Sequence, residues 1–207
     1  MVATWIARSW AAGPVVVFDP KGDDREAEIP NCTVCRRADD VVRRLPGRIL
    51  YRPGMGEYSA VPGSRLPGIW ARFEKICRKL YELGRRGVRP ILLVIHELAT
   101  LTTSQGIGPA FAQLIREGRS LGITIVMVTQ RPQGTSLLAR SEAQHVIAFT
   151  LADQGARDVA AELLSDIERP QMAAVVRSRP LPLDHRWWYR GPDFRLRLHD
   201  PLPLPRV

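Results

Sequence analysis

"ILLVIHELATL", residues 91–101, decides the fold, because five consecutive apolar residues lead directly to His96 and Glu97. A short, continuous apolar run is typical of a strand that is buried on both faces of a parallel sheet. The pattern returns in "ITIVMVTQRP", residues 123–132, where the apolar run ends in a polar tetrapeptide. Since ligands bind at the carboxyl ends of the strands in α/β sheets, the sequence predicts a polar site at this edge.

Apolar runs and amphipathic segments alternate along the rest of the chain. We expect strands over residues 15–18, 48–53, 91–95, 123–128 and 145–151, and helices over residues 2–11, 38–45, 69–84, 108–121 and 155–165. This alternation predicts an α/β fold with a parallel sheet. Residues 23–47 are otherwise polar and irregular, and residues 53–68 are expected to form a loop. Residues 1–170 should form the core of the fold, and residues 171–207 a short hairpin and a proline-rich tail.

The chain of 207 residues is strongly basic, with a formal net charge of +9 and a pI of about 10.3. This charge favours a polyanionic partner, first a nucleic acid and second an anionic membrane; a coding bias toward arginine is the alternative explanation. The helix over residues 69–84 carries a basic face that is either solvated or a DNA contact. That face consists of Arg72, Lys75, Arg78 and Lys79.

Three features favour a cytoplasmic location. No apolar run approaches the ~18–20 residues that span a bilayer. The first thirteen residues have no basic segment before their apolar part, which Arg8 interrupts, so they do not resemble a signal peptide. The three cysteines do not form the even set that is usual in secreted disulfide frameworks.

Glu97 and Gln130 follow the two buried strands and would flank a single water molecule at the sheet edge. Glu97 would polarise this water and Gln130 would orient it. Hydrolysis of a terminal phosphate needs this arrangement, because phosphoryl transfer depends mostly on positioning and on charge stabilisation.

Other interpretations of these residues remain open. His96 and Glu97 begin the HExxH pattern of zinc proteases, but Thr100 stands where the second histidine is required. His96 alone is also typical of a half-buried histidine whose hydrogen bonds are satisfied. Cys32 and Cys35 have a zinc-like spacing without a second pair nearby.

Three segments together resemble consecutive motifs of the FtsK/HerA P-loop ATPases, the DNA pumps that include conjugative coupling proteins. They are "VVVFDPKGDD" at residues 15–24, "ILLVIHELATL" at 91–101 and "REGRSLGITIVMVTQRPQG" at 116–134. In that family the second strand typically ends in Asp-Pro-Lys-Gly, the Walker B strand in Asp-Glu and the sensor strand in Thr-Gln-Arg-Pro. The resemblance covers roughly residues 2–165.

The resemblance implies a RecA-like P-loop NTPase fold, a parallel sheet with helices on both faces. It also implies ATP and Mg²⁺ as cofactors, double-stranded DNA as a partner, and a homo-oligomeric ring, typically a hexamer. Glu97 and Gln130 would be catalytic, Asp19, Lys21 and Arg131 would lie near the nucleotide, and His96 would occupy the metal position. Arginine fingers act between ring subunits, and the candidates are Arg116, Arg119 and Arg140, with Arg119 as the first choice.

The chain departs from the family in two ways. No GxxxxGK[ST] sequence, the Walker A loop that cradles phosphates, occurs in the 207 residues. In the family this loop and its strand precede the helix that corresponds to residues 2–11, so an N-terminal truncation or a degenerate subunit is expected. In addition, His96 stands where the family has an aspartate, although Mg²⁺ prefers oxygen ligands. Two hypotheses follow, an incomplete DNA translocase and a non-hydrolytic binding or structural subunit.

Overall fold

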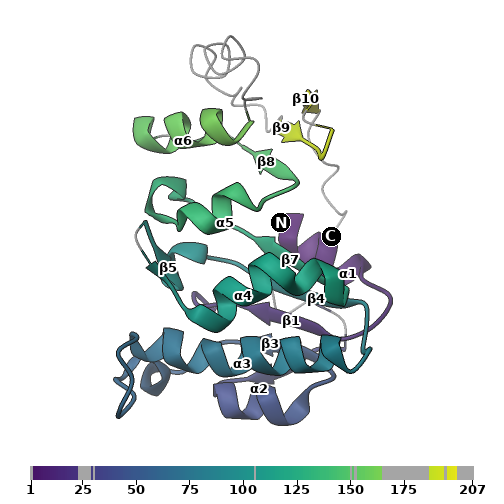
Figure 1. Cartoon of the computed structure of the whole chain (residues 1–207), viewed down its shortest axis with the longest axis vertical. Helices are drawn as coiled ribbons and strands as arrows, with labels where there is room; N and C mark the ends of the chain where they lie inside the picture. The colour runs from purple at the N-terminus through teal and green to yellow at the C-terminus, as the bar shows by residue number, and fades with distance from the viewer. Residues whose placement is uncertain are drawn as a thin grey trace. The chain divides into compact units, whose positions relative to one another are not determined.

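A computed structural model describes residues 2–22, 29, 31–104, 106–149, 151, 153–164, 187–193 and 195–199. The chain consists of two compact units, with the boundary between Thr129 and Gln130 (Figure 1). The boundary expected near residue 170 and the proline-rich end of the tail lie outside the described residues.

The first unit is built on a five-stranded sheet in which every pair of neighbouring strands is parallel. The order is β2 (Thr33–Cys35), β3 (Arg48–Tyr51), β1 (Val15–Phe18), β4 (Ile91–Ile95) and β7 (Ile123–Met127). All residues of β1 and β4 are buried, as their continuous apolar runs predict. The predicted α/β fold with a parallel sheet is therefore confirmed.

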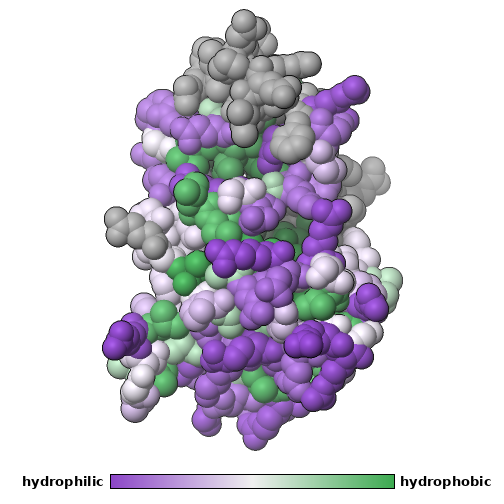
Figure 2. Space-filling view, in the orientation of Figure 1, coloured by the Kyte–Doolittle hydropathy of each residue, from purple (hydrophilic) through white to green (hydrophobic). Residues whose placement is uncertain are grey.

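Helices α2 (Ala38–Arg44), α3 (Gly68–Arg85) and α4 (Pro109–Glu117) lie on one side of this sheet. The ring centroids of Phe18 on β1 and Phe73 on α3 are 5.3 Å apart, and Phe73 meets Phe111 of α4 edge-on at 5.4 Å. The outer surface over α2 and α3 is mainly hydrophilic (Figure 2). These helices therefore show the polar-out, apolar-in pattern of sheet-covering helices.

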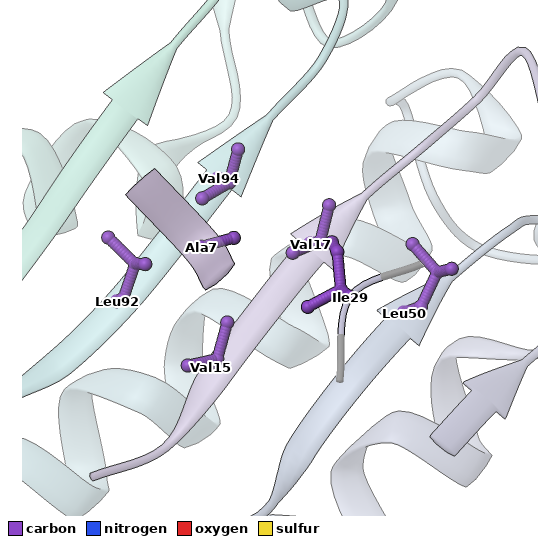
Figure 3. Close-up of a cluster of buried hydrophobic side chains, with 7 residues drawn as sticks. All are labelled: Ala7, Val15, Val17, Ile29, Leu50, Leu92 and Val94. Atoms are coloured by element: carbon purple, nitrogen blue, oxygen red, sulfur yellow. The ribbon is translucent and has the colours of Figure 1, made fainter. Parts of the chain in front are cut away.

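Helix α1 (Val2–Ser9) covers the opposite face of the sheet. Because side chains alternate along a strand, Val15 and Val17 point away from Phe18 and pack with Ala7 of α1. The buried cluster consists of Ala7, Val15, Val17, Ile29, Leu50, Leu92 and Val94 (Figure 3). Helices thus cover both faces, as the resemblance implies.

Two buried carboxylates join the helices to their surroundings. Glu74 of α3 accepts backbone hydrogen bonds from Ala110 at 2.7 Å and Phe111 at 3.0 Å, in the first turn of α4. This contact caps N–H groups that have no partner within the helix. Glu57, in the turn η2 (Met55–Tyr58), accepts hydrogen bonds from the Ala38 backbone at 2.8 Å and from the Tyr51 hydroxyl at 2.7 Å.

The element boundaries differ from the prediction in a few places. The helix predicted over residues 108–121 ends at Glu117, and a 3-10 turn, η4 (Gly118–Leu121), leads into β7. Within residues 23–47, which we expected to be irregular apart from the short helix, Thr33–Cys35 forms the edge strand β2. The structure adds the short elements η3 (Leu98–Thr100), β5 (Thr102–Thr103) and β6 (Gly106–Ile107) after β4.

The second unit holds a three-stranded antiparallel sheet and short helices. Its elements are η5 (Pro132–Gly134), α5 (Leu137–Ser141), β8 (Val146–Ala148), α6 (Gln154–Leu164), β9 (Trp187–Arg190) and β10 (Leu196–His199). The strand order in this sheet is β10-β9-β8. Ala148 of β8 and Trp188 of β9 pack against Ala161 of α6. The strand predicted over residues 145–151 is present as β8, and it pairs with the C-terminal hairpin rather than with the parallel sheet. Among the described helices, none is both long and apolar enough to cross a membrane.

Candidate active site

Backbone hydrogen bonds fix the residues that directly follow the parallel strands. The Asp19 N–H donates to Tyr51 O at 2.9 Å, the His96 N–H to Phe18 O at 3.0 Å, and the Val128 N–H to Ile95 O at 2.8 Å. The parallel ladder thus continues past the strand ends, and the polar residues that come next share one rigid edge. This is the edge at which the sequence predicts a site.

Glu97 lies at the centre of this edge, between residues contributed by the neighbouring strands. Its Oε1 accepts a hydrogen bond from Thr129 Oγ1 at 3.1 Å, and Thr129 follows β7. Its Oε2 is 3.3 Å from Lys21 Nζ, on the turn after β1. The Glu97 side chain is 13% exposed and that of Lys21 is 55% exposed. The carboxylate is therefore oriented on both oxygens, while its cationic partner reaches solvent.

The turn that carries Lys21 is held by Asp19. The Asp19 side chain is 1% exposed; its Oδ1 accepts the Gly22 N–H at 2.9 Å and its Oδ2 accepts Arg52 Nε–H at 2.8 Å. Gly22 has a φ of 68°, in the left-handed region that favours glycine. Because both carboxylate oxygens are engaged and buried, Asp19 supports the turn, and Lys21 is the residue of this motif that faces outward.

His96 and its surroundings do not form a good Mg²⁺ site. Glu97 Oε2 lies against the Lys21 ammonium, and Asp19 is turned toward Arg52. Within the part of the chain that the structure describes, no group of three or more His, Cys, Asp or Glu side chains is arranged to hold a metal ion. Mg²⁺ takes oxygen ligands in octahedral geometry, so these donors do not fit it, and the chemistry below involves no protein-held metal.

The other predicted site residues are not brought to Glu97 within the first unit. Arg119 lies in η4, before β7, and therefore at the opposite edge of the sheet from Thr129. The five residues of β7 separate the two edges by roughly 16 Å. Arg116 is exposed on the last turn of α4. The second unit contains Gln130, Arg131 and Arg140; the first two are exposed, and Gln130 directly follows Thr129 in the chain.

The basic face of α3 is largely neutralised by partners. Arg72 donates to the backbone carbonyl oxygens of Glu57 at 2.8 Å and Ser59 at 2.7 Å. Lys75 forms an ion pair with Asp39, and Lys79 forms one with Glu82. Arg78 of the same face is exposed. The DNA contact considered for this face therefore stays a prediction.

Cys32 and Cys35 are free thiols, and burial raises the pKa of both. A thiol with a raised pKa is less readily converted to the thiolate that binds zinc. The CxxC spacing therefore gains no support as a metal site.

Arg52 and Thr129 also lie at this edge, and the sequence did not identify them as site residues. Each stands directly after or one residue beyond an apolar strand, in the same position as Asp19 and Glu97. A polar residue at this position after an apolar strand is therefore a signal that could have identified both. The sequence does not show, however, that Arg52 neutralises Asp19 or that Thr129 orients Glu97.

Comparison with solved structures shows which proteins share this fold. The genome-packaging NTPase B204 of Sulfolobus turreted icosahedral virus 2, in complex with AMPPCP, matches with a TM-score of 0.63 and 15% sequence identity, over 91% of this chain and 83% of B204. The fold is that of a viral packaging NTPase. The same packaging NTPase in complex with sulfate matches with a TM-score of 0.64 at 14% identity, over 92% of this chain and 82% of that one. B204 from Sulfolobus turreted icosahedral virus, described as a DNA-packaging ATPase, matches with a TM-score of 0.63 at 14% identity, over 92% and 83%.

Sequence comparison adds a shorter match. Protein P9 of Pseudoalteromonas phage PM2 is 31% identical over 61 residues, which are 30% of this chain and 28% of P9. The matched part is thus little more than a quarter of that relative. No protein-family model matches the chain.

Proposed function

We propose that the chain is part of an ATP-hydrolysing motor that moves double-stranded DNA, of the FtsK/HerA type, and that it works in a homo-oligomeric ring. The observation that carries this proposal is Glu97, a carboxylate held at the carboxyl edge of the sheet by Lys21 and Thr129. The packaging-NTPase fold and the net charge of +9 support it.

The chemistry follows from the two partners of Glu97. Thr129 holds Oε1 of the Glu97 carboxylate, and Oε2 faces Lys21. The Lys21 ammonium is half-exposed and can exchange the carboxylate for the more highly charged phosphate oxygens of a nucleotide. Glu97 Oε2 then becomes available to accept a proton from the attacking water. Gln130, the next residue after Thr129, would help to orient that water.

The phosphate cradle has to come from a segment that these 207 residues do not contain, because no GxxxxGK[ST] sequence occurs in them. Among the described strands, β7 pairs only with β4, and none of them pairs with its other edge. A strand added there would end beside Thr129, at the edge that holds Glu97. We therefore propose that a strand with a phosphate-binding loop, supplied by another segment, pairs with β7.

The test is a chimaera in which the phosphate-loop strand of the B204 packaging NTPase precedes residue 2. The chimaera should hydrolyse ATP and do so faster with duplex DNA, whereas the 207-residue chain should not hydrolyse ATP, even after His96→Asp. Glu97→Gln should abolish turnover in the chimaera. Glu82→Gln, on the exposed side of α3, is the matched control and should leave turnover unchanged. Turnover that persists after Glu97→Gln would contradict the role of Glu97.

A second candidate, a non-hydrolytic DNA-binding or structural subunit, is favoured by a specific observation. His96 and its neighbours do not provide the oxygen donors that Mg²⁺ requires. This candidate predicts a chimaera that binds a fluorescent ATP analogue and duplex DNA but releases no phosphate, with or without His96→Asp.

A further inference from the structure

The antiparallel sheet of the second unit has two different faces. One face packs on α6 through Ala148 and Trp188. Residues directly opposite one another in an antiparallel sheet point to the same side. On the other face, Tyr189 lies opposite Ile147 on β8 and Arg197 on β10. This second face, which we call the ring face, consists of His145, Ile147, Phe149, Trp187, Tyr189, Arg195, Arg197 and His199.

The rings of this face form a continuous contact series. Trp187 and His199 stack with centroids 4.3 Å apart and planes inclined by 13°. Tyr189 stacks with His145 at 5.9 Å and 10°, and the Tyr189 oxygen is 2.7 Å from His145 Nδ1. Phe149 lies 6.4 Å from Trp187. Such mutual contacts fix the ring planes before any ligand arrives.

Part of the ring face is exposed to solvent, and its rings Trp187, Tyr189 and His199 are half-buried. Ile147 and Phe149 are each 39% exposed, although large apolar side chains are usually buried. His145, Arg195 and Arg197 are exposed as well. The α6 side of the sheet already supplies this unit with a packed core, so fold stability does not require a second aromatic face.

The charges on the ring face favour an anionic ligand. Arg197 lies on β10 opposite Tyr189, and Arg195 directly precedes β10. Asp193 is the acidic residue in contact with Arg197, and it holds that guanidinium at the end of the hairpin. Guanidinium groups next to flat rings bind phosphates and stack on bases.

We infer that the ring face binds single-stranded DNA, with unpaired bases stacking on its aromatic side chains and phosphates meeting Arg195 and Arg197. Exposed aromatic rings combined with cations are what sequence-tolerant single-strand binding requires. The Tyr189 hydroxyl and His145 Nδ1 are engaged with each other. The face therefore offers ring surface more than hydrogen-bonding groups, which argues against reading of base edges or of the ribose 2′-hydroxyl.

This inference concerns a different ligand and different residues from the proposed motor function. Its failure and that of the Glu97 proposal are therefore separate results. Bases in a duplex are already stacked on each other, so duplex DNA cannot use the rings in this way.

The test is fluorescence anisotropy of the whole chain with a fluorescein-labelled oligothymidylate of about twelve nucleotides. The same measurement is made with an oligouridylate and with a duplex of equal length. Oligothymidylate should bind and should quench tryptophan fluorescence. Phe149→Ala should weaken binding roughly 5- to 100-fold, from the contribution of one stacked base. Phe149→Trp should restore binding, because it keeps a stacking ring.

Leu137→Ala is the matched control, because Leu137 is a highly exposed apolar residue of the same unit on α5, outside the ring face. It should leave the affinity unchanged, and circular dichroism should show both alanine variants folded. Equal affinity of Phe149→Ala and the unmodified chain would overturn the inference. Oligouridylate binding at least tenfold tighter than oligothymidylate binding would also overturn it, as would a loss of duplex affinity in Phe149→Ala equal to its loss of oligothymidylate affinity. Self-association of the chain that Phe149→Ala abolishes would instead assign the ring face to a second copy.

Discussion

Lys21 Nζ lies 3.3 Å from Glu97 Oε2, so the turn after β1 meets the end of β4 through an ion pair that is open to solvent. Directly beside it, Asp19 and Arg52 form a second ion pair that is almost completely buried. The first pair is suited to exchange partners with a ligand, whereas the second is suited to hold the turn in place. This contrast in burial separates the residue that acts from the residue that supports it.

Asp19→Asn should lower the free energy of unfolding by about 3–5 kcal/mol, because the buried Arg52 guanidinium loses its ion pair with the Asp19 carboxylate. Lys21→Met is the matched control and should change stability by less than about 1 kcal/mol, since its ion pair is half-exposed and screened. Urea unfolding followed by circular dichroism measures both. Similar losses in the two variants would show that burial does not distinguish the pairs.

Glu74→Ala should destabilise the chain by about 2–4 kcal/mol, because the N–H groups of Ala110 and Phe111 lose their acceptor in a buried place. Glu82→Ala, on the same helix, removes only exposed ion pairs with Lys79 and Arg86 and should cost less than about 1 kcal/mol. Thermal unfolding of the two variants gives the comparison. If the losses are equal, the cap on α4 contributes nothing.

Tyr51 should make the stability sensitive to alkaline pH. Burial, with the hydrogen bond and negative charge of Glu57, raises the pKa of Tyr51 far above its ordinary value of about 10. The folded state therefore keeps this proton when the unfolded state loses it, and the resulting stability is present below about pH 10 and declines above it.

The measurement is the free energy of unfolding of the unmodified chain and of Tyr51→Phe between about pH 8 and pH 11. The phenylalanine variant should be less stable at about pH 8, because Glu57 loses a hydrogen-bond donor. The difference should shrink above about pH 10, by up to about 1.4 kcal/mol per pH unit. A difference that stays constant over this range would show that Tyr51 does not titrate as the burial implies.

Duplex DNA should bind the chain without sequence preference, because the net charge is +9 and no base-reading module is recognisable in the sequence. The logarithm of the affinity should fall with the logarithm of the salt concentration, with a slope of about −0.9 per phosphate neutralised. Anisotropy with two unrelated duplexes at several salt concentrations tests this. An affinity that is flat across the salt range would exclude a phosphate-dominated interface.

The open edge of β7 should promote self-association of the isolated chain. The N–H of Val128 pairs with β4, so along the strand the N–H groups of Ile123, Ile125 and Met127 point to the open side. Ile125→Pro removes one of these donors and leaves the β4 ladder intact, whereas Ile125→Val keeps it. Light scattering at increasing concentration should show association that only the proline variant weakens. A chain that stays monomeric and melts cooperatively at high temperature would show that the β7 edge is already covered.

Much of the fold was predictable because it depends on local patterns. β1 and β4 are apolar on both faces, and only a helix-covered parallel sheet buries such strands. β2 was missed because the strand has only three residues, two of which are exposed, so no apolar run marks it. β8 was recognised as a strand, but its pairing with the C-terminal hairpin was not predicted, since a single strand pattern does not specify its partner.

The candidate site was predictable only in part. Glu97 and Lys21 were identified from their positions after apolar runs and from the motif resemblance. The binding role expected for Asp19 does not account for its burial against Arg52. Arg119 was chosen by resemblance as an arginine finger that acts between subunits, and in this chain it lies in η4, at the other edge of the sheet from Glu97. Its role stays a prediction.

By itself, the sequence determined the layered α/β architecture and the edge at which polar residues gather, because both follow from hydrophobic patterning along the chain. Only the tertiary structure decided which polar residues meet. Asp19 and Arg52 are 33 positions apart, and Glu97 and Thr129 are 32 apart. Their contacts depend on strand order and register, which place the ends of β3, β1, β4 and β7 side by side. Burial then separated the supporting pair from the exposed one, and burial is a property of the packed chain.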